Sequence, residues 1–232
     1  TFRVLVHPRL STNSGAVMRD AALDDGRFAV RLGSPGSSVE ERGIIEAAEV
    51  ELRANGGNVY ALAGNTEGSI RATGVARSGG RVFLTGGGGG RVVVDKPVAA
   101  RRGDGSGGAI TVTGGTIEAG GLLDASAMAG DGGRVILWAA GATAFNGRIL
   151  AFGAGADARG GFAEVSGAAH LSFTGTVDTG GGTLLIDPAN IEISDCCAFV
   201  SGASIIDPTS ILSSLLTGHL VIQTTEADPG AG

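Results

Sequence analysis

The sequence predicts an all-β protein, a parallel β-helix (solenoid) with glycine-rich turns and one short helix near the C-terminus. Glycine accounts for 43 of the 232 residues, a Gly-Gly pair recurs about every 25 residues, and an alternating apolar run follows each pair. Collagen is excluded because the chain has only 6 prolines and no Gly-X-Y period. Disorder is excluded because 43% of the residues are hydrophobic.

The Gly-Gly pairs mark one fixed point in each repeat. Their first glycines are spaced by 23, 28, 25, 28 and 21 residues. The alternating run after each pair fits a strand with one buried face, and glycine permits the backbone conformations of a sharp corner. A sandwich or barrel also has short, regularly spaced strands, but such folds seldom place Gly-Gly at one point of every repeat. The pairs begin at Gly56, Gly79, Gly107, Gly132, Gly160 and Gly181.

Two or three strands of about five residues, with their turns, fill one such repeat. Successive coils would stack about 4.8 Å apart, so that aliphatic side chains line up with their equivalents above and below. Arg134 is expected at an outward corner. The side chains expected inside are those of Val82, Leu84, Val135 and Leu137.

A second unit falls between the pairs and reads Gly, any residue, aliphatic, any residue, small residue. The residue after the aliphatic should point outward and stack along one face, as do the acid-base rows of β-helical polysaccharide lyases and hydrolases. We favour a solvated face, because Leu150 interrupts the row and no sugar-stacking aromatic accompanies it. The units are Gly68–Ala72, Gly115–Ala119, Gly121–Ala125, Gly147–Ala151 and Gly175–Thr179, and the row is Arg71, Glu118, Asp124 and Asp178.

Residues 40–54 contain good helix formers after a capping-box pattern at Ser38 to Glu41. Apolar and charged residues nevertheless almost alternate there if one bulge is allowed at Ala48-Glu49, so strands are predicted. The tail, residues 195–232, breaks the repeat. It is predicted to form a short helix at about 209–216, with Ile211, Leu212, Leu215 and Leu216 on one face, and then a strand at 220–224.

Together, the Gly-Gly repeats, the second units and the tail resemble the filamentous haemagglutinin-like exoproteins of two-partner secretion, which are large adhesins of Gram-negative bacteria. The resemblance runs from about Arg27 to the end of the chain. Asparagine-proline motifs typical of the family's secretion domain are absent from residues 1–60. The segments that carry the resemblance are Gly56–Ala63, Gly68–Gly74, Gly160–Gly167, Phe173–Thr179, Leu184–Ser194 and Ile206–Thr224.

The resemblance implies a right-handed parallel β-helix over residues 1–194, with residues 1–55 as a candidate for the end of a secretion domain. Residues 195–232 would then be a helix-plus-strand extension leading into a further part. It also implies export through an outer-membrane β-barrel transporter to the bacterial cell surface. The expected function is structural and adhesive, through contacts with surface glycans or proteins. A β-helical polysaccharide-degrading enzyme and a self-assembling fibre subunit are the alternatives.

No catalytic residue, cofactor or metal site is expected. Asp104 and Asp131 lie in glycine-rich turns but lack the tandem pattern of calcium-binding β-rolls, and Asp favours turns in any case. His7, His170 and His219 are isolated, without neighbours at zinc-ligand spacing. A net charge of −6, with dispersed arginines and one lysine, argues against nucleic acid as a partner.

Cys196 and Cys197 are the only cysteines, and they are adjacent. One pair is too few for a disulfide scaffold. A disulfide between them, two reduced thiols and bridges to another segment all stay open, and a local structural role is favoured.

Overall fold

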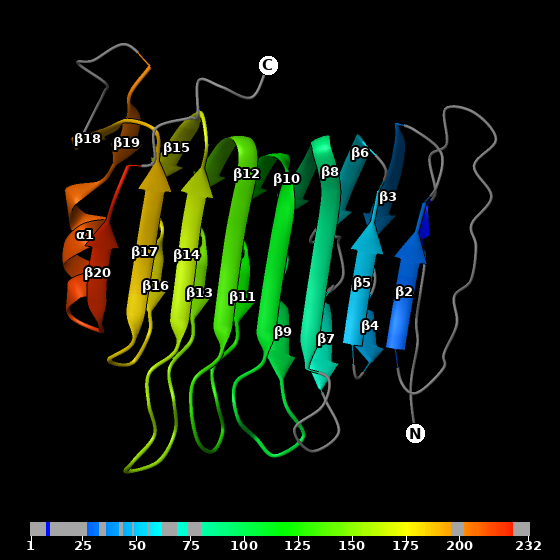
Figure 1. The fold of residues 1–232 in the computed structure, drawn as a ribbon. Helices are drawn as coiled ribbons and strands as arrows, with labels where there is room; N and C mark the ends of the chain where they lie inside the picture. Colours follow the sequence, from blue (N-terminus) through cyan, green and yellow to red (C-terminus); the bar gives the residue numbers. More distant parts are fainter. Residues whose placement is uncertain are drawn as a thin grey trace.

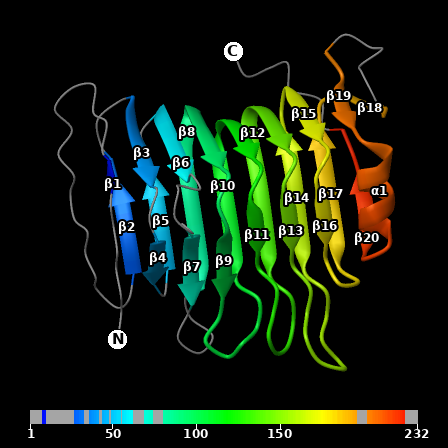
Figure 2. The ribbon, with the colours of Figure 1, turned by 180° about the vertical axis from the view of Figure 1, so that it is seen from behind.

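The computed structural model describes residues 8–9, 27–32, 36–41, 44–47, 49–54, 56–61, 69–73, 80–195 and 202–224. Within these ranges the protein is mostly β, with two sheets and one short helix, so the predicted all-β class is confirmed. The strands follow one another along an elongated body, with the first strands at one end and the last at the other (Figure 1). The view from behind shows the second sheet facing the first (Figure 2).

The larger sheet is parallel throughout the described residues, except where β1 pairs antiparallel with β3. Its fourteen described strands are β1 (Pro8–Arg9), β2 (Arg27–Arg31), β3 (Ser37–Glu41), β5 (Glu49–Arg53), β6 (Gly56–Ala61), β8 (Arg81–Val94), β10 (Ala109–Ala119), β12 (Arg134–Phe145), β14 (Phe162–Gly167), β15 (His170–Phe173), β17 (Thr183–Pro188), β18 (Ile191–Ile193), β19 (Ser204–Ile206) and β20 (His219–Ile222).

The smaller sheet is entirely parallel over the described part of the chain. Its strands are interspersed in sequence among those of the larger sheet, so the chain passes repeatedly from one sheet to the other. In spatial order they are β16 (Thr176–Asp178), β13 (Arg148–Leu150), β11 (Leu122–Asp124), β9 (Val98–Arg101), β7 (Ser69–Thr73) and β4 (Ile44–Ala47).

The strand register reproduces the Gly-Gly spacing of the sequence from the second pair onward. The first residues of β8, β10, β12, β14 and β17 lie side by side, at Arg81, Ala109, Arg134, Phe162 and Thr183. Neighbouring strands are therefore offset by 28, 25, 28 and 21 residues, which are the last four Gly-Gly spacings. The pairs do mark successive turns of a repeating path.

The first Gly-Gly pair, at Gly56, does not mark the same point. It opens β6, whose Val59 pairs with Val92 in the second half of β8. The first half of β8 pairs with β5, where Val50 lies beside Val82. The prediction that Gly56 begins an equivalent repeat was wrong, because β6 aligns with the second half of β8 and not with its first residues.

Strands, not a helix, form between residues 44 and 53, as predicted. They lie in different sheets, with β4 in the smaller sheet and β5 in the larger. The break in alternation at Ala48-Glu49 thus separates two strands, and is not a bulge within one.

Aliphatic side chains stack in rows between the two sheets. Val82, Leu84, Val135 and Leu137 are all fully buried, and Arg134 is exposed, which confirms the predicted inward and outward positions. Phe145 and Phe173 stack in the same core with ring centroids 5.3 Å apart. One row contains Leu52, Leu84, Val112, Leu137, Val165, Ile186 and Ile222.

Glycine just before β12 is required by close backbone packing. A Cβ atom on Gly133 would lie 2.3 Å from the carbonyl oxygen of Gly108 and 2.4 Å from that of Ala125. No side chain fits at such distances, so these backbone segments can approach each other this closely only with glycine there.

Helix α1 (Pro208–Leu215) confirms the short helix predicted at 209–216. The Asp207 carboxylate caps it, accepting hydrogen bonds from the backbone N–H groups of Thr209 and Ser210. Ile211 packs against the core, but Leu212, Leu215 and Leu216 are 63%, 51% and 87% exposed. The helix contacts β16 and β20. It therefore closes the end of the smaller sheet and turns most of its leucines outward.

Candidate functional site

The predicted outward row of charged residues forms only in part. Arg71 of β7, Asp124 of β11 and Asp178 of β16 occupy equivalent positions in the smaller sheet. Ala99 lies between the first two, and Leu150 lies between Asp124 and Asp178. The interruption at Leu150 is thus confirmed, and Ala99 adds a second one.

Glu118 does not belong to this row, contrary to the prediction. Its unit, Gly115–Ala119, forms the second half of β10 in the larger sheet, because Thr116 continues the same long strand after a register shift at Gly114. The Glu118 carboxylate accepts hydrogen bonds from Nε and Nη2 of Arg91, at 2.8 and 2.5 Å. Both side chains are about half exposed, so the pair is a surface ion pair of small energetic weight.

The two carboxylates that remain in the row are occupied by their own turns. Asp124 Oδ1 accepts hydrogen bonds from the backbone N–H and hydroxyl of Ser126, at 2.9 and 2.5 Å. Asp178 Oδ1 accepts one from the backbone N–H of Gly180, at 3.0 Å. Since β13 separates the two strands, these residues stand two strand spacings apart, about 10 Å. The geometry suits turn stabilisation, and Leu150 of β13 keeps the two carboxylates apart.

Of the aspartates in the glycine-rich turns, Asp104 has the same role, whereas Asp131 bonds to a residue 28 positions later in the chain. Asp104 Oδ1 accepts hydrogen bonds from the backbone N–H and hydroxyl of Ser106, at 3.0 and 2.6 Å. Asp131 Oδ1 accepts one from the backbone N–H of Arg159, at 2.9 Å. Such bonds replace the backbone partners that a turn residue lacks.

An open depression of about 410 Å³ lies beside the C-terminal end of the body. It holds one carboxylate, Asp178, and one imidazole, His219, whereas glycosidic cleavage by the usual route needs a pair of carboxyl groups. The depression is lined by Asp178, Gly180, Gly181, Leu216, Thr217, Gly218 and His219.

The remaining candidate residues, the histidines and cysteines, either form no cluster or lie outside the described residues. Where the chain is described, no three His, Cys, Asp or Glu side chains gather as a metal site would require. His170 begins β15 and His219 begins β20, while His7, Cys196 and Cys197 lie outside the described residues. No helix among the described residues has the length and apolarity to cross a membrane.

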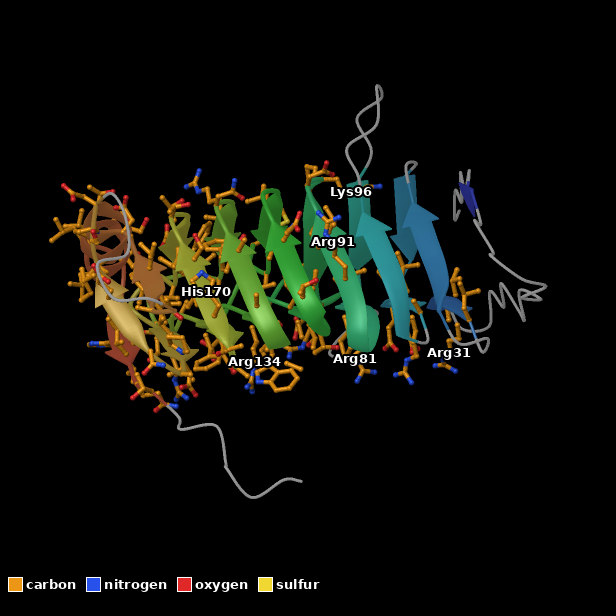
Figure 3. The ribbon with its side chains drawn as sticks, turned by 90° about the horizontal axis from the view of Figure 1, so that it is seen from above. Arg31, Arg81, Arg91, Lys96, Arg134 and His170 are labelled. Atoms are coloured by element: carbon orange, nitrogen blue, oxygen red, sulfur yellow. The ribbon has the colours of Figure 1, made fainter. Side chains whose placement is uncertain are left out.

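Charged side chains mark the N-terminal part of the larger sheet's outward face. Arg31 and Arg53 both contact Glu51, and Arg81 Nη2 lies 2.7 Å from Glu49 Oε2. The Glu51 carboxylate raises the pKa of Arg31, mainly by accepting its hydrogen bond. Figure 3 shows Arg31, Arg81 and Arg134 along one side of the body.

The same face carries aromatic residues farther along, which the sequence interpretation missed. Trp138 of β12 points outward and is 45% exposed. The Arg134 guanidinium lies over the ring of Phe162, 4.8 Å from its centroid, and so forms a cation–π contact between neighbouring strands. The strict alternation of Arg-Val-Ile-Leu-Trp after Gly133 could have shown that the indole is on the outer face.

No known protein family, curated protein or solved structure matches this chain.

Proposed function

We propose that this chain is a right-handed parallel β-helical segment of a secreted bacterial cell-surface adhesin. It would supply stiff length and an extended binding surface, and it would reach the surface by two-partner secretion. The observation that carries the proposal is the unbroken succession of parallel strand pairs that leads from β2 to β20 in the larger sheet.

Alternation between the two sheets supports the solenoid. The chain goes from β8 in the larger sheet to β9 in the smaller, then to β10, β11, β12 and β13 in the same manner. Each time the chain returns to the larger sheet, its new strand pairs with a strand that it formed there before. Such a path winds around the core between the two sheets. Connections between parallel strands are right-handed in nearly all proteins, so we assign that hand.

The outer surfaces support a mechanical and adhesive role. The carboxylates of the predicted row, Asp124 and Asp178, are engaged by their turns, and Glu118 is engaged by Arg91. Repeats that contact only their neighbours give a rod with long, flat outer faces. Extended faces of this kind suit weak contacts repeated along glycans or proteins of another surface.

Export through an outer-membrane β-barrel transporter follows from the family resemblance and fits the folding of such a rod. Each coil packs on the coil before it, so a chain that emerges unfolded can fold from one end outside the cell. Burial of each new edge then retains the chain on the outer side.

Deletion of the cognate β-barrel transporter in the native bacterium tests the proposal. Surface display of the protein, measured with an antibody on intact cells, should disappear and return with a plasmid copy of the transporter. Display of an unrelated outer-membrane protein is the control. Persistent display, or folded protein in the cytoplasm, would contradict export by this route. A reducing-sugar assay on the purified chain tests the polysaccharide-degrading alternative, which we expect to give no turnover.

A second candidate, self-association into fibres, is favoured by the C-terminal end. Among the described strands β20 pairs with β17 alone, and Leu212, Leu215 and Leu216 of the adjoining helix segment are exposed. Unpaired strand edges next to apolar side chains favour association between copies. Sedimentation velocity over a hundredfold concentration range separates a monomeric rod from a growing fibre.

A further inference from the structure

Trp138 is the only tryptophan in the chain, and it stands on the outside of the larger sheet. The core has room for large rings, since Phe145 and Phe173 are buried in it. Trp138 nevertheless occupies an outward position of β12, 45% exposed, between buried Leu137 and Ala139. Exposed apolar side chains that stand singly are common on protein surfaces, so the neighbours of this ring decide whether it marks a binding surface.

Hydrogen-bonding side chains flank this ring along the rod. In the strand register the partly exposed Thr113 of β10 lies on one side of Trp138, and Ser166 of β14, which is only 3% exposed, lies on the other. Thr85 follows on β8, and its hydroxyl lies 3.3 Å from that of Thr113. Four neighbouring strands thus place uncharged side chains in one line, spaced by about 4.8 Å.

The parallel row two residues earlier widens this surface. Thr111, Ile136, Glu164 and Leu185 are all partly exposed there. The Ser166 hydroxyl donates a hydrogen bond to Glu164 Oε1 at 3.3 Å. Apolar and hydrogen-bonding groups therefore alternate on one face, as in sites that recognise ligands with both characters.

From this arrangement we propose that the outward face of β10, β12 and β14 around Trp138 binds a neutral oligosaccharide lying along the rod. A sugar ring has an apolar C–H face, which can stack on the indole, and a rim of hydroxyl groups, which can bond to Thr111, Thr113 and Glu164. The inference rests on the proposed adhesive function and names its ligand class.

The charges on this face favour a neutral ligand over a polyanion. The row of Trp138 is uncharged from Thr85 to Ser166, and Arg53 and Asp187 stand at opposite ends of it. Arg134, the nearest arginine along β12, already lies over the Phe162 ring. A polyanion would need several unengaged cations in a line.

The single tryptophan makes the test direct, because its fluorescence reports only on this position. Purified chain is titrated with cellohexaose and with the hexamer of N-acetylglucosamine, and a heparin hexasaccharide is the charged comparison. We expect a saturable change in emission with at least one neutral hexamer in the millimolar range or below, and none with heparin. No saturable change with either neutral hexamer would overturn the proposal, and so would a preference for heparin.

Calorimetry on two variants completes the test. Trp138→Ala should weaken binding at least tenfold, while Val93→Ala, an outward apolar residue in the second half of β8, should leave it unchanged. Both variants should keep the circular dichroism spectrum and urea midpoint of the parent, since both side chains point away from the core. Equal binding by the two variants, or burial of Trp138 in a dimer seen by sedimentation, would overturn the proposal. Either result leaves surface display, and hence the adhesin proposal, to its own test.

Discussion

Replacing Leu137 by Ala tests the inward register on which the whole fold depends. Leu137 is fully buried, between Val112 of β10 and Val165 of β14. Both neighbours are held by parallel strand pairing on either side, so the surrounding strands cannot close the space that the smaller side chain leaves. Leu→Ala at such sites costs about 2–5 kcal/mol, and limited relaxation places this variant near 3 kcal/mol.

The matched control is Ile136→Ala, the residue next to Leu137 on the opposite face of β12. Ile136 is partly exposed, so its replacement by Ala should lower the free energy of unfolding by less than about 1 kcal/mol. Urea unfolding followed by circular dichroism gives the two free energies, with the slope m expected to stay unchanged. Similar losses in the two variants would refute the assigned faces. A larger loss for Ile136→Ala would require a register shifted by one residue, which exchanges the two faces.

Three further outcomes are expected. Gly133→Ala should lower the thermal midpoint by several degrees, because the new Cβ meets carbonyl oxygens at 2.3 and 2.4 Å. Gly89→Ala, whose Cβ would have nothing within 4 Å, should leave the midpoint unchanged, and equal midpoints would contradict the close backbone packing at Gly133. Leu216→Ser should leave the urea midpoint unchanged, since this side chain is 87% exposed, and a marked loss would show that the leucine face of α1 is covered. The pKa of Asp207 is lowered, mainly by the hydrogen bond from the Thr209 hydroxyl, so its cap stabilises α1 above the unfolded pKa of about 3.9 and is lost as pH falls through the folded value. Amide protection at Thr209 and Ser210 should fall in that acid range and in Asp207→Ala at neutral pH, and unchanged protection in both would contradict the cap.

The local pattern of this chain fixes much of its architecture. Alternation of apolar residues places Val135 and Leu137 inside, because successive side chains of a strand point to opposite faces. The Gly-Gly spacing predicts which residues become neighbours from Arg81 to Thr183, since the same turn recurs once per repeat. The helix near residue 209 also follows locally, from the Asp207-Pro208 start and its capping bonds.

Other features depend on contacts between residues far apart in the sequence. The prediction for Glu118 failed because the pattern Gly-x-aliphatic-x-small fits a short strand of either sheet. Only strand pairing decides to which sheet the segment belongs. The prediction for the Gly56 pair failed for the same reason, since the local sequence does not tell whether the strand that follows aligns with the first or the second half of β8.

The sequence by itself determined the strand faces, the repeat length and the all-β class, because these follow from the period of the side chains and from what glycine permits. Only the tertiary structure decided which outward residues meet. Thr113, Trp138 and Ser166 lie 25 and 28 residues apart, and parallel pairing brings them into one line. Likewise, α1 turns Leu212, Leu215 and Leu216 outward because its position against β16 and β20 leaves only one side of the helix to the core.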